Sequence, residues 1–148
     1  MRRKDFGWPA SALLLAISGV MLIGVGCYFL FIRPGLLPED IRYMGLTPAE
    51  LDSIGPRLAA WLNHVFKVMG GYVTATGVLA LTLAATAFRQ RSSWAVAGSI
   101  VAGLASIGWM AVTNFMINSD YKWVLLGFAF TWAASIAAFA LEARRDVR

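Results

Sequence analysis

The chain has 148 residues, of which 59% are hydrophobic and 14% are charged, and its formal net charge is +5. This length indicates a single domain, residues 1–148, and apolar segments occupy so much of it that no separate soluble catalytic domain can fit. The positive charge could suggest nucleic-acid binding. The basic residues flank apolar segments, however, and we therefore expect no nucleic-acid partner.

Four apolar segments contain no Asp, Glu, Lys, Arg or His: residues 10–32, 68–88, 94–117 and 123–141. A helix rises about 1.5 Å per residue, so about 20 residues cross a hydrocarbon core of about 30 Å. The sequence therefore predicts an all-α protein, an integral membrane four-helix transmembrane bundle. Because no ionisable side chain lies in a span, an ion path or proton relay through the membrane is not expected.

The first of these segments begins after a basic tail and could be a secretory signal instead of a span. It is longer than the roughly 7–15 residues of a signal core, and it ends at Arg33 and Pro34 without a small-residue cleavage pattern. We expect it to be retained. The only cysteine, Cys27, lies within it, and we expect this side chain to act as a small buried hydrophobe.

Residues 33–67 connect the first two spans and predict an external loop that contains a short helix. Thr47 and Glu50 form a capping-box pattern, in which each side chain accepts a hydrogen bond from the backbone N–H of the other residue. The pattern predicts a helix over residues 48–54. A Gly-Pro pair at 55–56 predicts the end of that helix and the start of another that leads into the second span. We expect the short helix to be an extracytoplasmic cap on the bundle.

The charged residues divide unequally between the two sides of the predicted bundle. The two termini and the turn between the second and third spans carry the whole net charge of +5, whereas residues 33–67 and 118–122 are balanced. The positive-inside rule then places both termini in the cytoplasm. We expect a plasma membrane location, and the small size and arginine-rich turns favour a bacterial inner membrane. The basic residues on the predicted cytoplasmic side are Arg2, Arg3, Lys4, Arg89, Arg91, Arg144, Arg145 and Arg148.

Polar and aromatic residues near the predicted outer face form a candidate ligand site. His64 and Lys67 are three residues apart and share a helix face, Tyr72 follows them, and Trp109 and Asn114 lie in the third span. A pocket between these five residues could bind a lipid headgroup or a quinone. Alternatively, Lys67 reaches the headgroups, His64 pairs with an acidic residue of the loop, and Asn114 forms a hydrogen bond between helices.

One histidine and one cysteine cannot supply the several ligands of a haem, zinc, copper or iron site within a single chain. We therefore predict no metal, no catalytic residues and no cofactor, although a bound quinone or lipid would fit the apolar spans. Small residues recur in the spans and predict close helix packing. The partner of these small-residue stripes could be another helix of the chain or a second copy.

The second span opens with Lys67, Gly70, Gly71 and Tyr72, followed by Gly77. This motif, with an inward N-terminus, a loop after the first span and two closely spaced final spans, resembles the DoxX-like group of small bacterial four-helix membrane proteins. The resemblance covers the layout of most of the chain. Some members accompany quinone-linked sulfur oxidation, so the resemblance implies an accessory subunit beside a redox partner. The capped loop and the lack of a cysteine or histidine pair depart from that pattern.

Two functions fit the sequence best, and a third, an enzyme acting on a lipid or a quinone through His64 and an acidic residue of the loop, is less favoured. The first is a small non-catalytic membrane protein that serves as an accessory or interaction subunit, bound to membrane lipid and to a membrane protein partner or a second copy of itself. The second is a binder or carrier of a hydrophobic small molecule, a quinone or a lipid, with its pocket near the outer face.

Overall fold

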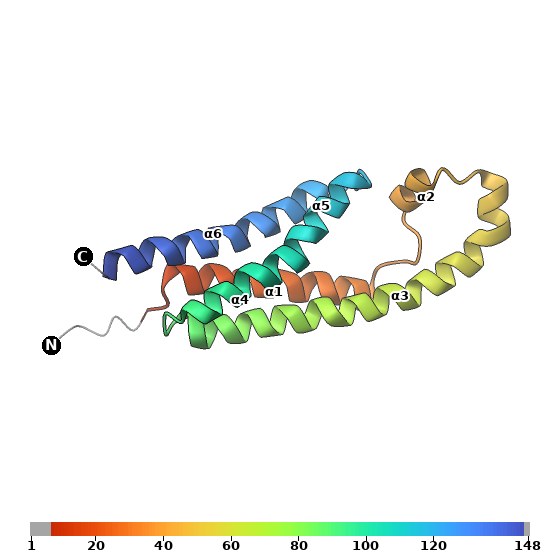
Figure 1. The fold of residues 1–148 in the computed structure, drawn as a ribbon. Helices are drawn as coiled ribbons and strands as arrows, with labels where there is room; N and C mark the ends of the chain where they lie inside the picture. Colours follow the sequence, from red (N-terminus) through yellow and green to blue (C-terminus); the bar gives the residue numbers. More distant parts are fainter. Residues whose placement is uncertain (1–6, 147–148) are drawn as a thin grey trace.

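The structure is a computed structural model that describes residues 7–146, and within this range it consists of helices and short turns with no strand (Figure 1). Arg2, Arg3, Lys4 and Arg148, which contribute to the predicted charge asymmetry, lie outside the described residues. The elements are α1 (Ala10–Phe31), α2 (Pro38–Met44), α3 (Pro48–Leu83), the π-helical turn η1 (Ala84–Phe88), α4 (Ser93–Gly103), the π-helical turn η2 (Leu104–Gly108), α5 (Trp109–Met116) and α6 (Lys122–Asp146).

Four helical segments are long and apolar enough to cross a membrane, which confirms the predicted all-α helical bundle. They are Ala10–Phe31, Pro48–Phe88, Ser93–Met116 and Lys122–Arg145. Large apolar side chains cover the outside of the bundle; Val20, Leu79, Val101 and Phe130 are all more than half exposed. Such a surface is stable against lipid and would be a liability in water. The chain is a multi-pass membrane protein.

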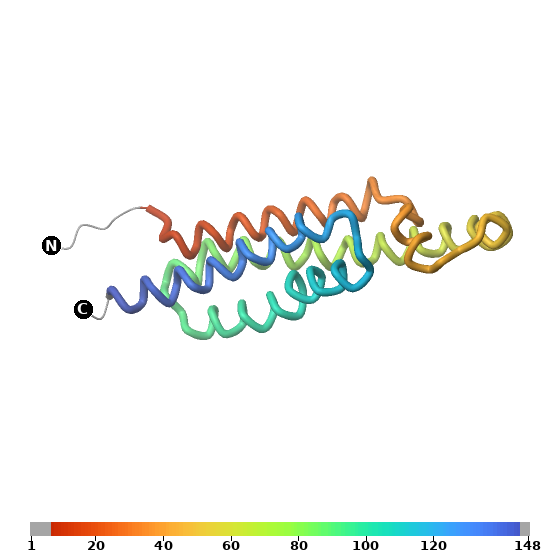
Figure 2. Tube along the Cα trace, turned by 90° about the horizontal axis from the view of Figure 1, so that it is seen from above, coloured from red at the N-terminus to blue at the C-terminus, as the bar shows by residue number. Residues whose placement is uncertain are grey.

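The helices α1 and α3 lie side by side in both views of the bundle (Figures 1 and 2). Glycines allow the two backbones to touch: a Cβ added to Gly77 would lie 2.6 Å from the carbonyl oxygen of Gly19, and one added to Gly26 would lie 2.6 Å from the backbone nitrogen of Thr74. Lipid gives no hydrophobic drive between helices, so this close backbone packing is a main source of attraction. It fixes α1 against α3 along much of their length.

The helix α3 begins as predicted but does not end as predicted. The Thr47 hydroxyl accepts a hydrogen bond from the Glu50 N–H at 3.3 Å, and the Glu50 carboxylate accepts one from the Thr47 N–H at 2.9 Å. The predicted short helix over 48–54 is wrong in extent, because the helix continues through Pro56 into the second span. A proline can bend a helix instead of ending it when helix-forming residues stand on both sides, and Figure 1 shows α3 curving in its first half.

The third span slants across the bundle. Its first part, α4, lies beside η1, and its last part, α5, packs on α6 (Figure 1). Trp132 of α6 anchors the middle of the span: its Nε1 donates to the Ser99 carbonyl at 3.2 Å, and a Cβ added to Gly103 would lie 2.0 Å from its ring. Because α5 packs alongside α6, the distance between α5 and α3 increases toward the end of the bundle where α2 lies.

The opposite end of the bundle, where α1 begins and α6 ends, is held by a polar cluster. The Glu142 carboxylate accepts hydrogen bonds from the Ser11 N–H at 3.2 Å and from the Ser11 hydroxyl at 2.6 Å, and it forms an ion pair with Arg91. The rings of Phe88 and Phe139 pack beside it with centroids 5.2 Å apart. One carboxylate thus joins the start of α1, the turn before α4 and the end of α6. We call this end the terminal end and the other the α2 end.

Replacing Gly77 with Ala should destabilise the bundle by about 1–3 kcal/mol, because the added methyl group meets the backbone of α1. Thermal unfolding in detergent, followed by circular dichroism, measures the change. Gly71→Ala is the matched control on the same helix, because a Cβ there meets nothing within 4 Å. Equal melting temperatures for the two variants would contradict the assigned α1–α3 contact.

Replacing Glu142 with Ala should destabilise the protein by about 1–3 kcal/mol, since Ser11 and Arg91 lose the acceptor that they share. The same melting experiment applies. Arg145→Ala removes a charge from an exposed position on the same helix and should change stability by less than about 0.5 kcal/mol. The assignment of Glu142 fails if its loss is no more harmful than the loss of Arg145.

Candidate ligand-binding site

A cavity of about 800 Å³ lies between the helices at the α2 end. The helices α1, α3, α5 and α6 supply its walls, and α2 covers its end. The walls are almost entirely apolar, so the cavity is suited to hydrocarbon. The main wall residues are Met21, Val25 and Phe29 from α1, Phe66, Met69 and Val73 from α3, Trp109, Met110 and Ile117 from α5 and its end, and Leu125 and Phe128 from α6.

The helix arrangement explains why this space exists. The glycine contacts hold α3 against α1, while the slant of the third span carries α5 toward α6 and away from α3. The π-helical turn η2 lies where the cavity begins, and π turns inside helices are frequent at functional sites. A second cavity of about 230 Å³ lies further toward the terminal end and shares Leu22, Thr76 and Ser106 with the first. The two cavities therefore adjoin along the bundle.

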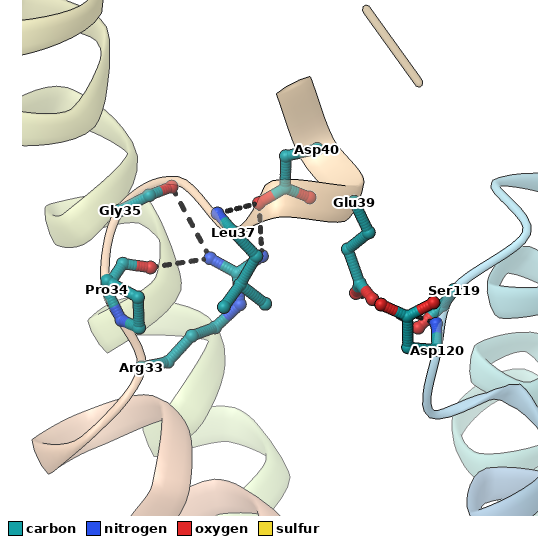
Figure 3. Close-up of polar contacts among 8 residues, drawn as sticks. All are labelled: Arg33, Pro34, Gly35, Leu37, Glu39, Asp40, Ser119 and Asp120. Carbon is teal, nitrogen blue, oxygen red and sulfur yellow. Dashed lines mark hydrogen bonds and ion pairs between the residues drawn. The ribbon is translucent and has the colours of Figure 1, made fainter. Parts of the chain in front are cut away.

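A buried ion pair closes one side of the α2 end. Arg33 is 8% exposed, and its guanidinium lies 2.9 Å from the Asp40 carboxylate. The same guanidinium donates to the Pro34 carbonyl at 2.9 Å (Figure 3). It also lies 3.4 Å from the ring centre of Phe66. The Asp40 carboxylate also accepts the Leu37 N–H at 2.8 Å and so caps the start of α2. These contacts fix α2 to the end of α1 and to α3.

Glu39, next to Asp40 on α2, connects α2 to the turn before α6, on the other side of the cavity end. Glu39 is 6% exposed, and its carboxylate accepts hydrogen bonds from the Ser119 hydroxyl at 3.0 Å and from the Asp120 N–H at 2.9 Å. Figure 3 shows Glu39 and Asp40 pointing in opposite directions, one to the turn before α6 and one to Arg33. The helix α2 therefore bridges the cavity end. An exposed ion pair between Arg42 and Asp120, at 3.1 Å, adds a weaker connection.

Glu39 differs from Asp40 in having no cation beside it. Within residues 7–146, no Arg, Lys or His nitrogen lies within ion-pair distance of its carboxylate. Arg33, Glu39 and Asp40 all line the cavity. The polar end of the cavity thus contains two carboxylates and one guanidinium, and its net charge is negative.

The structure places two of the five sequence-predicted site residues at the cavity. Trp109 lines it, but the ring is 64% exposed and therefore stands at the rim of the bundle. Asn114 also lines it, and its Nδ2 donates to the Met110 carbonyl of its own helix at 2.9 Å. His64, Lys67 and Tyr72 are exposed on another face of α3 and do not line the cavity. The five residues are not brought together.

Sequence reasoning did not select Arg33, Glu39 and Asp40 as site residues, because charges beside a span are expected to set topology. One signal was present. Pro38 is followed two positions later by Asp40, and a proline at the first helical position with an acidic residue in the first turn is typical of a helix start. Among the described residues no group of His, Cys, Asp and Glu is arranged to hold a metal ion.

Comparisons of this chain with protein-family models, with curated proteins and with solved structures find no match. The resemblance to the DoxX-like group stays a prediction. The geometry of the cavity therefore carries the functional argument.

Replacing Asp40 with Ala should loosen α2, because buried Arg33 loses its partner and the first turn of α2 loses its cap. We expect hydrogen exchange over residues 37–44 to become at least about tenfold faster, which corresponds to about 1.4 kcal/mol. Asp52→Ala, at an exposed position in the first half of α3, is the control. Unchanged exchange in α2 of the Asp40 variant would contradict the assigned role of the ion pair.

Proposed function

We propose that this protein is a non-catalytic membrane protein that binds one amphipathic small molecule of the lipid or quinone class in the α2-end cavity. The observation that supports the proposal is the cavity itself, about 800 Å³ in volume, with apolar walls and a polar end under α2. Ligand sites commonly measure about 300–1,000 Å³ and combine apolar walls with a few polar groups that orient the ligand. The hydrocarbon part of the molecule would lie between the helices, with its head beneath α2.

The position of Trp109 favours entry of the ligand into the cavity from the side of the bundle. This ring lines the cavity and is also largely exposed on the surface that faces lipid. A molecule dissolved in the bilayer could pass this rim without crossing the polar end under α2. The smaller adjoining cavity offers space for a longer hydrocarbon chain.

The arrangement of charge favours a cytoplasmic terminal end. Arg89, Arg91, Arg144 and Arg145 all lie near that end, beside the last turns of the spans. Under the positive-inside rule this end faces the cytoplasm, in a bacterial plasma membrane. The head of the ligand would then lie at the outer face of the membrane.

A second candidate function is that of an accessory subunit, and the first half of α3 favours it. This part of the helix extends past the ends of α5 and α6 (Figure 1). Trp61 on it and Tyr43 on α2 are 62% and 64% exposed. Exposed aromatic side chains beyond the bundle fit either the headgroup region of the membrane or the surface of a protein partner. Co-purification of a stable protein partner with an empty cavity would favour this candidate.

Filling the cavity tests the proposal. Gly24 lines the cavity and a Cβ there meets nothing within 4 Å, so Phe at this position should occupy the space without a backbone clash. Native mass spectrometry of the protein purified in mild detergent should show a retained small molecule for the natural sequence. We expect the occupied fraction to fall at least about tenfold in the Gly24→Phe variant.

Gly127→Phe is the matched control. Gly127 lies on α6, it does not line the cavity, and a Cβ there also meets nothing within 4 Å. This variant should retain the molecule at the original level. An empty natural protein, or equal retention by the Gly24 and Gly127 variants, would contradict the proposal.

A further inference from the structure

We infer that the cavity selects a head that donates hydrogen bonds and carries no negative charge, either a hydroxyl group, as in an alcohol or the reduced quinol form of a quinone, or a protonated amine. The inference rests on the proposed function, since it names the head of the molecule that the cavity would hold. It comes from the ionic groups under α2.

Arg33 is not free to receive an acidic head. Its guanidinium is paired with Asp40 at 2.9 Å and donates to the Pro34 carbonyl at 2.9 Å, and Phe66 covers one face of it. These contacts leave N–H groups of the guanidinium unused, but an anion that approached them would lie close to the Asp40 carboxylate, and one guanidinium would then face two negative charges in a largely buried place. Repulsion between like charges makes that arrangement unfavourable.

Unlike Arg33, the other basic residues near the α2 end do not line the cavity. His64 and Lys67 lie on the exposed face of α3, and Arg42 pairs with Asp120 at the surface. Lys122, at the start of α6, donates to the Asn118 side chain. Within the part of the chain that the structure describes, the cavity therefore offers no cation without a partner.

Glu39 is the residue that favours a ligand head able to donate hydrogen bonds. The residue is more than nine-tenths buried, and its carboxylate accepts two hydrogen bonds, from the Ser119 hydroxyl and from the Asp120 N–H. A carboxylate has about four acceptor sites, so it can accept further hydrogen bonds from a molecule in the cavity. A buried carboxylate without a cation is costly, and a hydroxyl or ammonium donor would reduce that cost.

The remaining polar groups at this end do not discriminate among the possible ligand heads. Tyr28, Thr113 and Tyr121 line the cavity, and the hydroxyl group of each can donate or accept a hydrogen bond. They would suit an alcohol, an amine or an acid equally. The choice among heads therefore depends on Glu39, whose negative charge has no cation beside it among residues 7–146 and repels an anion more strongly in a site of low dielectric than in water.

Three amphiphiles with the same chain test the inference: hexadecanol, hexadecylamine and hexadecanesulfonate, which remains anionic at neutral pH. Each competes with the others for the purified full-length protein, and native mass spectrometry measures the bound fractions. We count only binding that Gly24→Phe abolishes and Gly127→Phe leaves intact. The alcohol and the amine should bind at least about tenfold more tightly than the sulfonate.

Replacing Glu39 with Gln gives a second measurement, with Glu50→Gln, on the exposed first turn of α3, as the control. The Glu39 variant should reduce the advantage of the amine over the sulfonate at least about fivefold, and the control should leave it unchanged. Sulfonate binding as tight as that of the alcohol in the natural protein would overturn the inference while leaving the cavity proposal intact. Failure of all three amphiphiles to bind at the Gly24-sensitive site would instead overturn the proposed function.

Discussion

Backbone contact between α1 and α3, at Gly19 with Gly77 and at Gly26 with Thr74, belongs to the most extensive helix–helix contact within residues 7–146. Side chains of normal size would separate the helices and fill the space between them evenly. Because this pair is fixed, the third span can follow α6 instead of α3 at the α2 end. The cavity is the direct consequence of that unequal packing.

The two ends of the bundle are closed by different means. At the terminal end, Glu142 and the Phe88–Phe139 pair join three chain segments directly. At the α2 end the helices are further apart, and a short helix joins them through Asp40 on one side and Glu39 on the other. Charged groups are thus used for closure at both ends and are absent from the four apolar segments, residues 10–32, 68–88, 94–117 and 123–141, where they would be energetically costly.

The spans could be predicted because long segments without charge have few other stable arrangements, and the start of α3 could be predicted because Thr47 and Glu50 satisfy the helix end locally. The continuation of α3 through Pro56 could not be predicted, since a proline ends or bends a helix depending on what surrounds it. The cavity-facing side of α3 was also unpredictable. A membrane helix is apolar all round, so its sequence does not separate the side that carries Phe66 from the side that carries Tyr72.

The central claim is that the α2-end cavity holds an amphipathic molecule. An experimental structure of the protein extracted in its own membrane lipid tests this most directly. We predict elongated density between α1, α3, α5 and α6, with its polar end within hydrogen-bond distance of the Glu39 carboxylate. A bundle in which α5 has closed onto α3 and the cavity is absent would contradict the account.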